Sequence, residues 1–263
     1  MSKEYQGVLT FAQQVDGELS GVSLELIGKA RDLAKDLNTQ VTALLLGSGV
    51  RPLAQTLVEY GADRVIVVDD KALDTYTTEP YTQAMTAVIN QYKPEIVLVG
   101  ATAIGRDLGP RVAGRVHTGL TADCTKLEIE PQTHAFHMTR PAFGGNLMAT
   151  IICPEHRPQM ATVRPGVMVR EIRDAARQGE VVDFAWTAEE NACYVQVEEV
   201  IKKVTKKIDI QAAKILVAGG RGMGSGENFQ LLQELADALG GEVASSRAAV
   251  DAGWQEKDRQ VGQ

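Results

Sequence analysis

Residues 41–70 read VTALLLGSGVRPLAQTLVEYGADRVIVVDD, and this stretch decides the fold class. Its two apolar runs, residues 41–46 and 65–68, carry no charge, as is typical of strands that are buried on both faces of a sheet. Between them Leu53 and Leu57 recur at the spacing of a helix. The stretch therefore predicts a strand, a helix and a second strand parallel to the first.

The same alternation continues on both sides of this stretch. We expect further strands at residues 7–12 and 96–99, and further helices at residues 20–37, 80–92 and 106–117. Together these elements predict an α/β fold in which helices cover both faces of a parallel sheet. Such sheets usually bind ligands beyond the carboxyl ends of their strands, which here are Gly47-Ser48-Gly49, Asp69-Asp70 and Gly100-Ala101-Thr102.

The pattern changes after Thr121, where turn residues follow one another more closely. We expect a β-rich extension with turns at Pro131 and Gly144-Gly145. Its predicted strands are residues 125–130, 134–140 and 147–153, with further strand at 160–163 and 181–185.

Residues 194–207 are mixed in charge and are expected to form a connector. A new unit then begins with a strand at 215–218, a glycine loop at 219–222, a helix at 228–239 and a short strand at 243–244. We therefore predict two domains, residues 1–190 and residues 191–263.

The composition excludes several classes of protein. The chain has 263 residues and a net charge of -7, which argues against nucleic acid as the main partner. No apolar stretch approaches the ~18 residues of a membrane span, and no signal peptide follows the N-terminal methionine. The three cysteines have neither disulfide nor metal-site spacing. We expect a soluble protein of the reducing cytoplasm.

The sequence motifs indicate neither a metal site nor a hydrolase active site. His134 and His137 lie three apart in a predicted strand, which would place them on opposite faces. No nucleophile elbow, zinc-protease or phosphate-loop motif occurs. We expect no metal site.

The glycine loop of the second unit is the best candidate for a nucleotide site. Glycines lie at 219, 220, 222, 224 and 226, a spacing that differs from the dinucleotide fingerprint GxGxxG. A nucleotide loop and an ordinary glycine-rich turn therefore both remain open. Arg221 suits phosphate recognition but also suits a plain surface position, and Ser246-Arg247 follow the next strand.

Several long motifs occur in an order that resembles the alpha subunit of electron transfer flavoproteins. In the first domain these are GRDL at 105–108, TGLTADC at 118–124, TRPAFGGN at 139–146 and PQMATVRPG at 158–166. In the second they are GGRG at 219–222, GENF at 226–229, SRAAVDAGW at 246–254 and DRQVGQ at 258–263. The resemblance spans nearly the whole chain.

The resemblance implies a Rossmann-like N-terminal domain, an FAD-binding C-terminal domain and a heterodimer with a beta subunit. The beta subunit of this family carries AMP or a second FAD. The resemblance further implies an electron-transfer protein rather than a conventional enzyme. Its electrons would come from acyl-CoA dehydrogenase, as in fatty acid β-oxidation, from another flavoprotein redox partner or from NADH.

The resemblance also assigns site residues. Arg221 and Ser246 match positions that contact FAD, and Arg247 matches the arginine that lies against the isoalloxazine ring. The segment that lines the flavin corresponds to Gln260, Val261, Gly262 and Gln263.

The chain ends at Gln263, ahead of the segment with which this family completes its FAD domain. Two functions therefore remain open. In one, the chain is the electron-carrying subunit. In the other, it is an assembly module that docks a beta subunit without holding FAD, because its FAD domain is incomplete.

Overall fold

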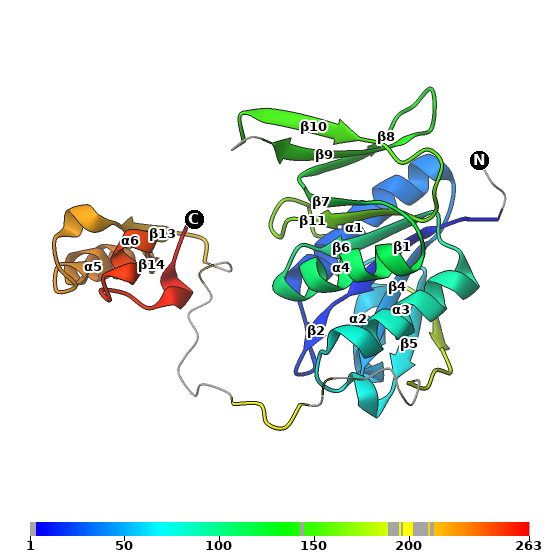
Figure 1. Ribbon diagram of the computed structural model, residues 1–263, viewed down its shortest axis with the longest axis horizontal. Helices are drawn as coiled ribbons and strands as arrows, with labels where there is room; N and C mark the ends of the chain where they lie inside the picture. The colour runs from blue at the N-terminus through cyan, green and yellow to red at the C-terminus, as the bar shows by residue number, and fades with distance from the viewer. Residues whose placement is uncertain are drawn as a thin grey trace. The chain divides into compact units, whose positions relative to one another are not determined.

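The computed structural model describes residues 4–142, 145–188, 195, 197–201, 210 and 213–262 (Figure 1). The chain divides into two compact units, Met1–Glu198 and Glu199–Gln263. The predicted domain boundary between residues 190 and 191 lies outside the described residues, as do Phe143, Gly144 and most of the predicted connector. Each unit is described by itself.

A seven-stranded sheet forms the centre of the first unit as far as it is described, with strand order β12-β5-β4-β1-β6-β11-β7. All of its pairings are parallel, which confirms the predicted α/β class. The strands are β1 (Val8–Ala12), β4 (Val41–Gly47), β5 (Arg64–Asp69), β6 (Ile96–Gly100), β7 (Leu120–Cys124), β11 (Gln159–Val163) and β12 (Glu180–Asp183).

Helices cover both faces of this sheet. Successive residues of a strand point to opposite faces, so each strand contributes to both of the cores that the helices cover. Val8 of β1 belongs to the core that α1 (Gly21–Leu37) and α2 (Ala54–Glu59) cover. Its neighbour Leu9 belongs to the core under α3 (Thr78–Tyr92) and α4 (Ala103–Arg115). Short 3-10 turns, η1 (Arg51–Leu53) and η2 (Lys71–Leu73), precede α2 and α3.

The β-rich extension is smaller than predicted. It is an antiparallel sheet of order β10-β9-β8, formed by β8 (Lys126–Ile129), β9 (Phe136–Ala142) and β10 (Leu147–Ile151). The expected strands near 160–163 and 181–185 exist as β11 and β12, but they return to the parallel sheet. The prediction also missed β7. His134 is not in a strand but in the turn before β9, with a φ of 56°. A small hairpin, β2 (Gln14–Val15) and β3 (Glu18–Leu19), follows β1.

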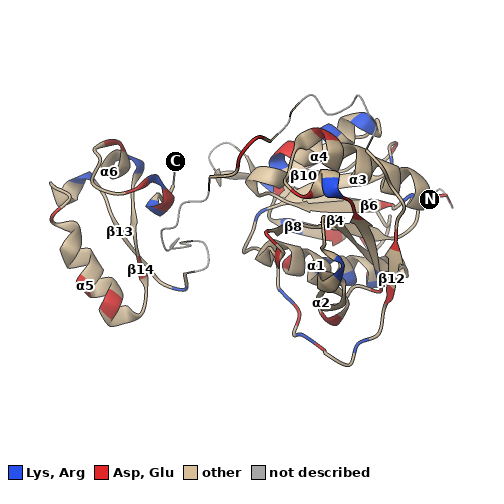
Figure 2. Cartoon of the chain, turned by 90° about the horizontal axis from the view of Figure 1, so that it is seen from below, with Lys and Arg blue, Asp and Glu red and all other residues tan. Residues whose placement is uncertain are grey.

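A strap, residues 164–179, links β11 to β12 across α1 and α2. It crosses α1 at Gly28, where an added Cβ would lie 2.5 Å from the Val169 carbonyl oxygen. Ion pairs hold it to α2 and to the loop that follows, with Arg173 Nε 2.6 Å from a Glu59 carboxylate oxygen. Positively and negatively charged side chains alternate along the strap (Figure 2). Ion pairs of Arg173 with Glu59 and of Arg177 with Asp63 fix its path, together with packing.

The second unit repeats the parallel arrangement on a smaller scale. Its strands β13 (Leu216–Gly219) and β14 (Glu242–Ser245) are parallel, and α5 (Phe229–Leu239) crosses between them. The turn η4 (Arg221–Met223) follows β13, and the short helix α6 (Arg247–Asp251) follows β14. The turn η5 (Lys257–Arg259) comes after α6. Its core contains Phe229, Ala236, Val243 and Ala249.

Candidate functional site

The two predicted ligand segments of the second unit meet at the carboxyl ends of β13 and β14. A Cβ added to Gly220 would lie 3.3 Å from Ser246 Oγ. The Ser246 backbone N–H donates to the Gly219 carbonyl at 2.9 Å. The glycine loop and Ser246 therefore lie side by side, at the end of the sheet where parallel sheets hold ligands.

In the glycine loop, Gly219 allows close packing against α5, whereas Gly222 has open space beside it. An added Cβ at Gly219 would lie 2.4 Å from a Leu232 methyl, so this glycine lets the strand approach α5 closely. Gly222 has no other atom within 4 Å of an added Cβ, and Gly224 takes a φ of 79°. The Asn228 side-chain amide donates to the Met223 carbonyl and closes the loop. The loop is thus held at both ends and open in its middle.

Two arginines begin the segments that follow the two strand ends, η4 after β13 and α6 after β14. Arg221 begins η4 and is exposed, and it makes no ion pair within the described part of the chain. Arg247 begins α6, and its Nε lies 3.4 Å from an Asp251 carboxylate oxygen. Both members of that pair are about two-thirds exposed, at 69% and 66% of their side-chain area. Such a pair is weak, so both arginines are available to an anionic ligand.

The segment before the chain's last residue runs beside β14. Gln260 forms a parallel bridge with Ser245, and the Val261 N–H donates to the Ser245 carbonyl at 2.8 Å. Arg259 anchors it by donating to the Val243 carbonyl at 3.1 Å. Gly262 follows with a φ of 76°. The structure thus places Gln260 and Val261 next to Ser245, the residue before Ser246, whereas Gln263 lies outside the described residues.

Ser245 was not predicted as a site residue. Its side chain is fully buried, and its Oγ has no hydrogen-bond partner within the described residues. Its position as the last residue of β14 is the signal that could have identified it. An unpaired buried hydroxyl calls for a ligand or water partner. The hydroxyls, guanidinium groups and open glycine loop together fit the phosphates and flavin of FAD.

At the carboxyl ends of the first unit's strands, polar groups of the loops form hydrogen bonds with one another. The Gly49 N–H donates to Asp69 Oδ1 at 2.7 Å, and Thr102 Oγ1 lies 2.6 Å from Gln13 Oε1. The Gly105 N–H donates back to Thr102 Oγ1. The groups that the sequence offered for a ligand there thus serve to close the loops of the sheet.

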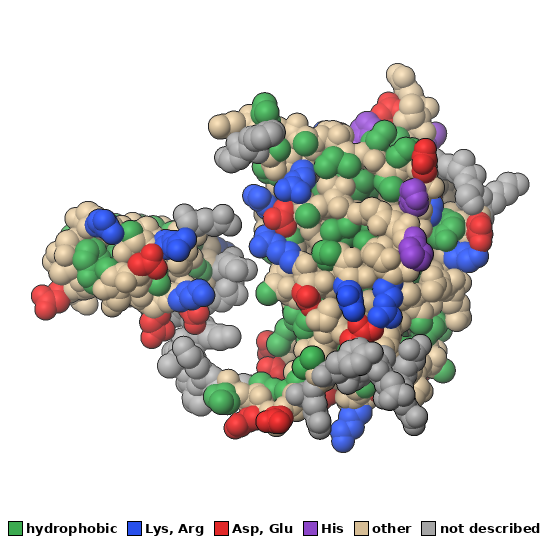
Figure 3. All heavy atoms as spheres, in the orientation of Figure 1, with side chains coloured by type: hydrophobic (Ala, Val, Ile, Leu, Met, Phe, Trp, Pro, Cys, Tyr) green, Lys and Arg blue, Asp and Glu red, His purple; other side chains and the backbone are tan. Residues whose placement is uncertain are grey.

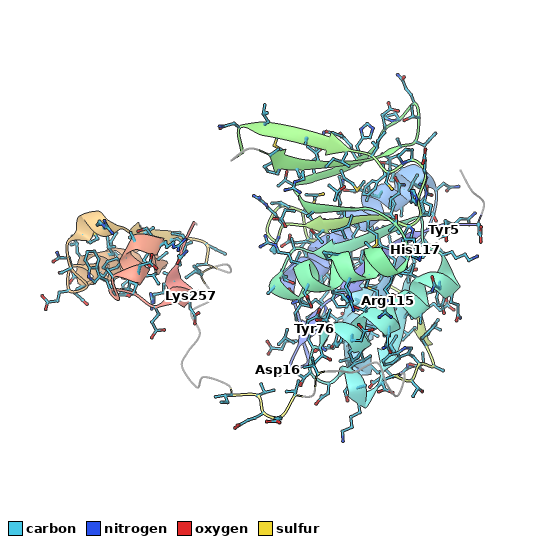
Figure 4. All side chains as sticks on the ribbon, in the orientation of Figure 1. Tyr5, Asp16, Tyr76, Arg115, His117 and Lys257 are labelled. Carbon is cyan, nitrogen blue, oxygen red and sulfur yellow. The ribbon has the colours of Figure 1, made fainter. Side chains whose placement is uncertain are left out.

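A cavity of about 840 Å³ lies between the beginnings of α3 and α4 in the first unit. The hydroxyls of Tyr76 (Figure 4) and Thr78 donate to Asp107 Oδ2 at 2.5 and 2.6 Å. Glu79 pairs with both Arg111 and Arg115. These polar groups are already matched to one another, so they offer a ligand little.

Neither a metal cluster nor a membrane span occurs within the described ranges. No three His, Cys, Asp or Glu side chains gather there in a metal-binding arrangement. No helix in that part of the chain is both long enough and apolar enough to cross a bilayer.

Two known protein-family models match most of the chain. The electron transfer flavoprotein domain matches residues 8–189, and the electron transfer flavoprotein FAD-binding domain matches residues 209–263. The chain belongs to the electron transfer flavoprotein alpha-subunit family. The resemblance drawn from its motifs is thereby confirmed.

Curated relatives cover almost all of this electron transfer flavoprotein chain. Protein FixB of Clostridium saccharobutylicum is 56% identical over 261 residues, which are 99% of this chain and 77% of the relative. Electron transfer flavoprotein subunit alpha of Thermoanaerobacterium thermosaccharolyticum is 49% identical, over 99% of this chain and 78% of the relative. The electron transfer subunit beta of acryloyl-CoA reductase from Anaerotignum propionicum is 41% identical, over 98% and 78%.

Proposed function

We propose that this chain is the electron-carrying subunit of an electron transfer flavoprotein heterodimer and holds FAD on its second unit. The close approach of the glycine loop to Ser246 carries the proposal: the Ser246 N–H donates to the Gly219 carbonyl, and a Cβ added to Gly220 would lie 3.3 Å from Ser246 Oγ. The match of residues 209–263 to an FAD-binding domain supports the same assignment. Bound FAD would supply the redox chemistry of the subunit.

Each residue of the site has a proposed task. Arg221 pairs with a phosphate of FAD, and the Ser246 hydroxyl donates a hydrogen bond to the cofactor. Arg247 leaves Asp251 and places its positive charge against the flavin ring. Gln260, Val261 and Gly262 line the flavin with their backbone, and the same role is proposed for Gln263.

The partners remain proposals as well. We propose a beta subunit that carries AMP or a second FAD, docked on the first unit. The electron donor is proposed to be an acyl-CoA dehydrogenase, another flavoprotein or NADH. The names of two relatives, an acryloyl-CoA reductase subunit and a lactate dehydrogenase (NAD(+),ferredoxin) subunit, do not single out fatty acid β-oxidation. Sparse cysteines without a disulfide among the described residues support the cytoplasm as location.

Flavin absorbance of the purified chain, with and without the cognate beta subunit, tests the main proposal. A visible flavin spectrum that elutes with the protein is the expected result. Gly220→Val should abolish it, because the added methyl groups meet Ser246, whereas Gly119→Val has open space and should not. If a folded heterodimer shows no flavin absorbance, the chain is the non-flavin assembly module instead. Extraction followed by chromatography identifies AMP or FAD in the beta subunit.

A further inference from the structure

The two edges of β14 have different neighbours. On one edge, the N–H groups of Glu242 and Ser246 donate to backbone carbonyls of the β13 segment, at 3.0 and 2.9 Å. Backbone groups of alternate residues in a strand face opposite neighbours. The carbonyls of Val243 and Ser245 therefore face the other edge of β14, away from β13.

This second edge begins a parallel ladder that breaks off after one step. The Ser245 carbonyl accepts from the Val261 N–H at 2.8 Å. Two residues back on each strand, the ladder would continue from the Arg259 N–H to the Val243 carbonyl. That N–H is used elsewhere, because it donates to the Glu256 carbonyl at 3.1 Å in the turn η5.

The guanidinium of Arg259 takes the place of this missing donor. Its Nη1 donates to the Val243 carbonyl at 3.1 Å. Val243 is 1% exposed, so its carbonyl would otherwise be a buried acceptor without a partner. A hydrogen bond from a charged donor is also stronger than one from a neutral donor. The side chain thus allows the chain to wind into η5 and still stay in register with β14.

Residues 260–262, which we call the lining segment, follow directly after this anchor. The Gln260 side-chain amide donates to the Gly262 carbonyl at 3.2 Å, which closes the segment on itself. Gly262 then turns the chain with a φ of 76°. Because the lining segment is a small closed loop, its position follows from where its start is held, at the bonds that Arg259 and Val261 make to β14.

Arg259 acts from behind the proposed flavin site. Val243 comes two residues before Ser245, so its carbonyl lies about 7 Å further from the carboxyl end of β14. Ligands of parallel sheets lie beyond those ends. A guanidinium bound to the Val243 carbonyl is therefore placed to hold the chain rather than to touch FAD.

We propose that Arg259 is a positioning residue for the flavin. Its bond to the Val243 carbonyl holds the lining segment where its backbone meets the isoalloxazine ring. The inference rests on the proposed function. Without the guanidinium, the Val243 carbonyl regains a donor only if the Arg259 N–H leaves η5 and extends the strand, and that change moves the lining segment.

Arg259→Met, in the heterodimer with the cognate beta subunit, removes the donor and leaves an apolar side chain in its place. Lys257→Met is the matched control, because Lys257 (Figure 4) is exposed, lies in the same turn and loses the same charge. Figure 3 shows basic and acidic side chains mixed on the surface of the second unit, so the loss of one exposed, screened charge changes the field little.

FAD affinity, measured by quenching of flavin fluorescence, should fall by at least about 10-fold in Arg259→Met and by less than about 2-fold in Lys257→Met. Arg259→Lys keeps a charged donor and should lie between Arg259→Met and the wild type. The visible circular dichroism of the flavin at saturating FAD should change in Arg259→Met alone. A role in folding only would lower the melting temperature and leave the affinity and dichroism of the folded protein unchanged.

Hydrogen exchange after removal of FAD tests the anchor without the cofactor. Exchange of the Val261 amide should be at least about 10-fold faster in Arg259→Met, whereas the Ser246 amide on the other edge of β14 should exchange as in the wild type. Should Arg259→Met fail to fold, Arg259→Gln takes its place, because its amide ends well short of the guanidinium.

Wild-type affinity and dichroism of Arg259→Met at full occupancy would overturn the inference. So would an equal loss in Lys257→Met, or unchanged exchange at Val261. Each of these results leaves the proposed function standing, because the wild type still binds FAD. A wild-type heterodimer that binds no FAD would refute the proposed function, and the inference with it.

Discussion

Replacing Arg247 by alanine should change the redox potential of the flavin far more than it changes protein stability. The guanidinium is 69% exposed, and its only ion pair among the described residues is with Asp251, four residues on at 3.4 Å. An exposed pair of this spacing contributes about 0.3–0.5 kcal/mol. The free energy of unfolding should therefore fall by no more than roughly 0.5 kcal/mol.

The effect on the flavin is larger because a reduced flavin gains negative charge. A unit charge about 4 Å away, at an effective dielectric constant of about 20, contributes roughly 4 kcal/mol. Solvent around an exposed arginine removes most of this. If a third survives, the loss is about 1.4 kcal/mol, a tenfold change in the equilibrium constant. For a one-electron couple that corresponds to about 59 mV. Arg247→Ala should lower the potential of the first electron by at least this amount.

Potentiometric titration of the reconstituted heterodimer, alongside thermal unfolding, checks both halves of the expectation. Arg247→Lys should retain the charge but lose the planar contact, so its potential should lie between those of the wild type and Arg247→Ala. Asp251→Asn releases the guanidinium and should leave the potential at or above that of the wild type. An unchanged potential at full flavin occupancy in Arg247→Ala would refute the reasoning, and Arg247 would then only secure the loop after β14.

Three further expectations concern the first unit. Gly28→Ala should cost about 1–3 kcal/mol of unfolding free energy, because its Cβ would meet the Val169 carbonyl oxygen; Gly114→Ala, with open space, is the control, and equal stability of both in urea would contradict this. Burial would raise the pKa of Glu79, but hydrogen bonds from two arginines of α4 hold it below its ordinary value of 4.5. Stability should therefore fall as pH drops through the lowered pKa, and Glu79→Gln should flatten this acid limb in urea unfolding; an unchanged limb would exclude Glu79 as its source. Burial raises the pKa of the Cys124 thiol from 9.0 to about 11, so its contribution to stability is present below about pH 9 and is lost as pH rises toward 11. Cys124→Ala should reduce that alkaline slope in denaturant titrations, and parallel slopes would count against it.

The sequence predicted most helices and strands because each leaves a local periodic pattern. The apolar runs at 41–46 and 65–68 became β4 and β5, and the helical pattern from Ser20 became α1. β7 escaped prediction because Leu120–Cys124 mixes polar and apolar residues at the edge of the sheet. An edge strand needs no continuous apolar run, since one side of it has no neighbour.

For the candidate site, motif resemblance supplied Arg221, Ser246 and Arg247 but could not say how they are arranged. The hydrogen bond from the Ser246 N–H to the Gly219 carbonyl and the unpaired hydroxyl of Ser245 appear only when the strands are assembled. Their roles in binding FAD stay predictions.

By itself, the sequence determined the α/β class and the family, because helix and strand periods and long motifs are local properties of the chain. Only the tertiary structure decided where each strand goes. β10 (LMATI) and β11 (QMATV) have similar sequences, yet β11 is buried between β6 and β7, whereas β10 remains exposed. Which strand finds a second neighbour depends on residues far away in the chain, and no local pattern records that choice.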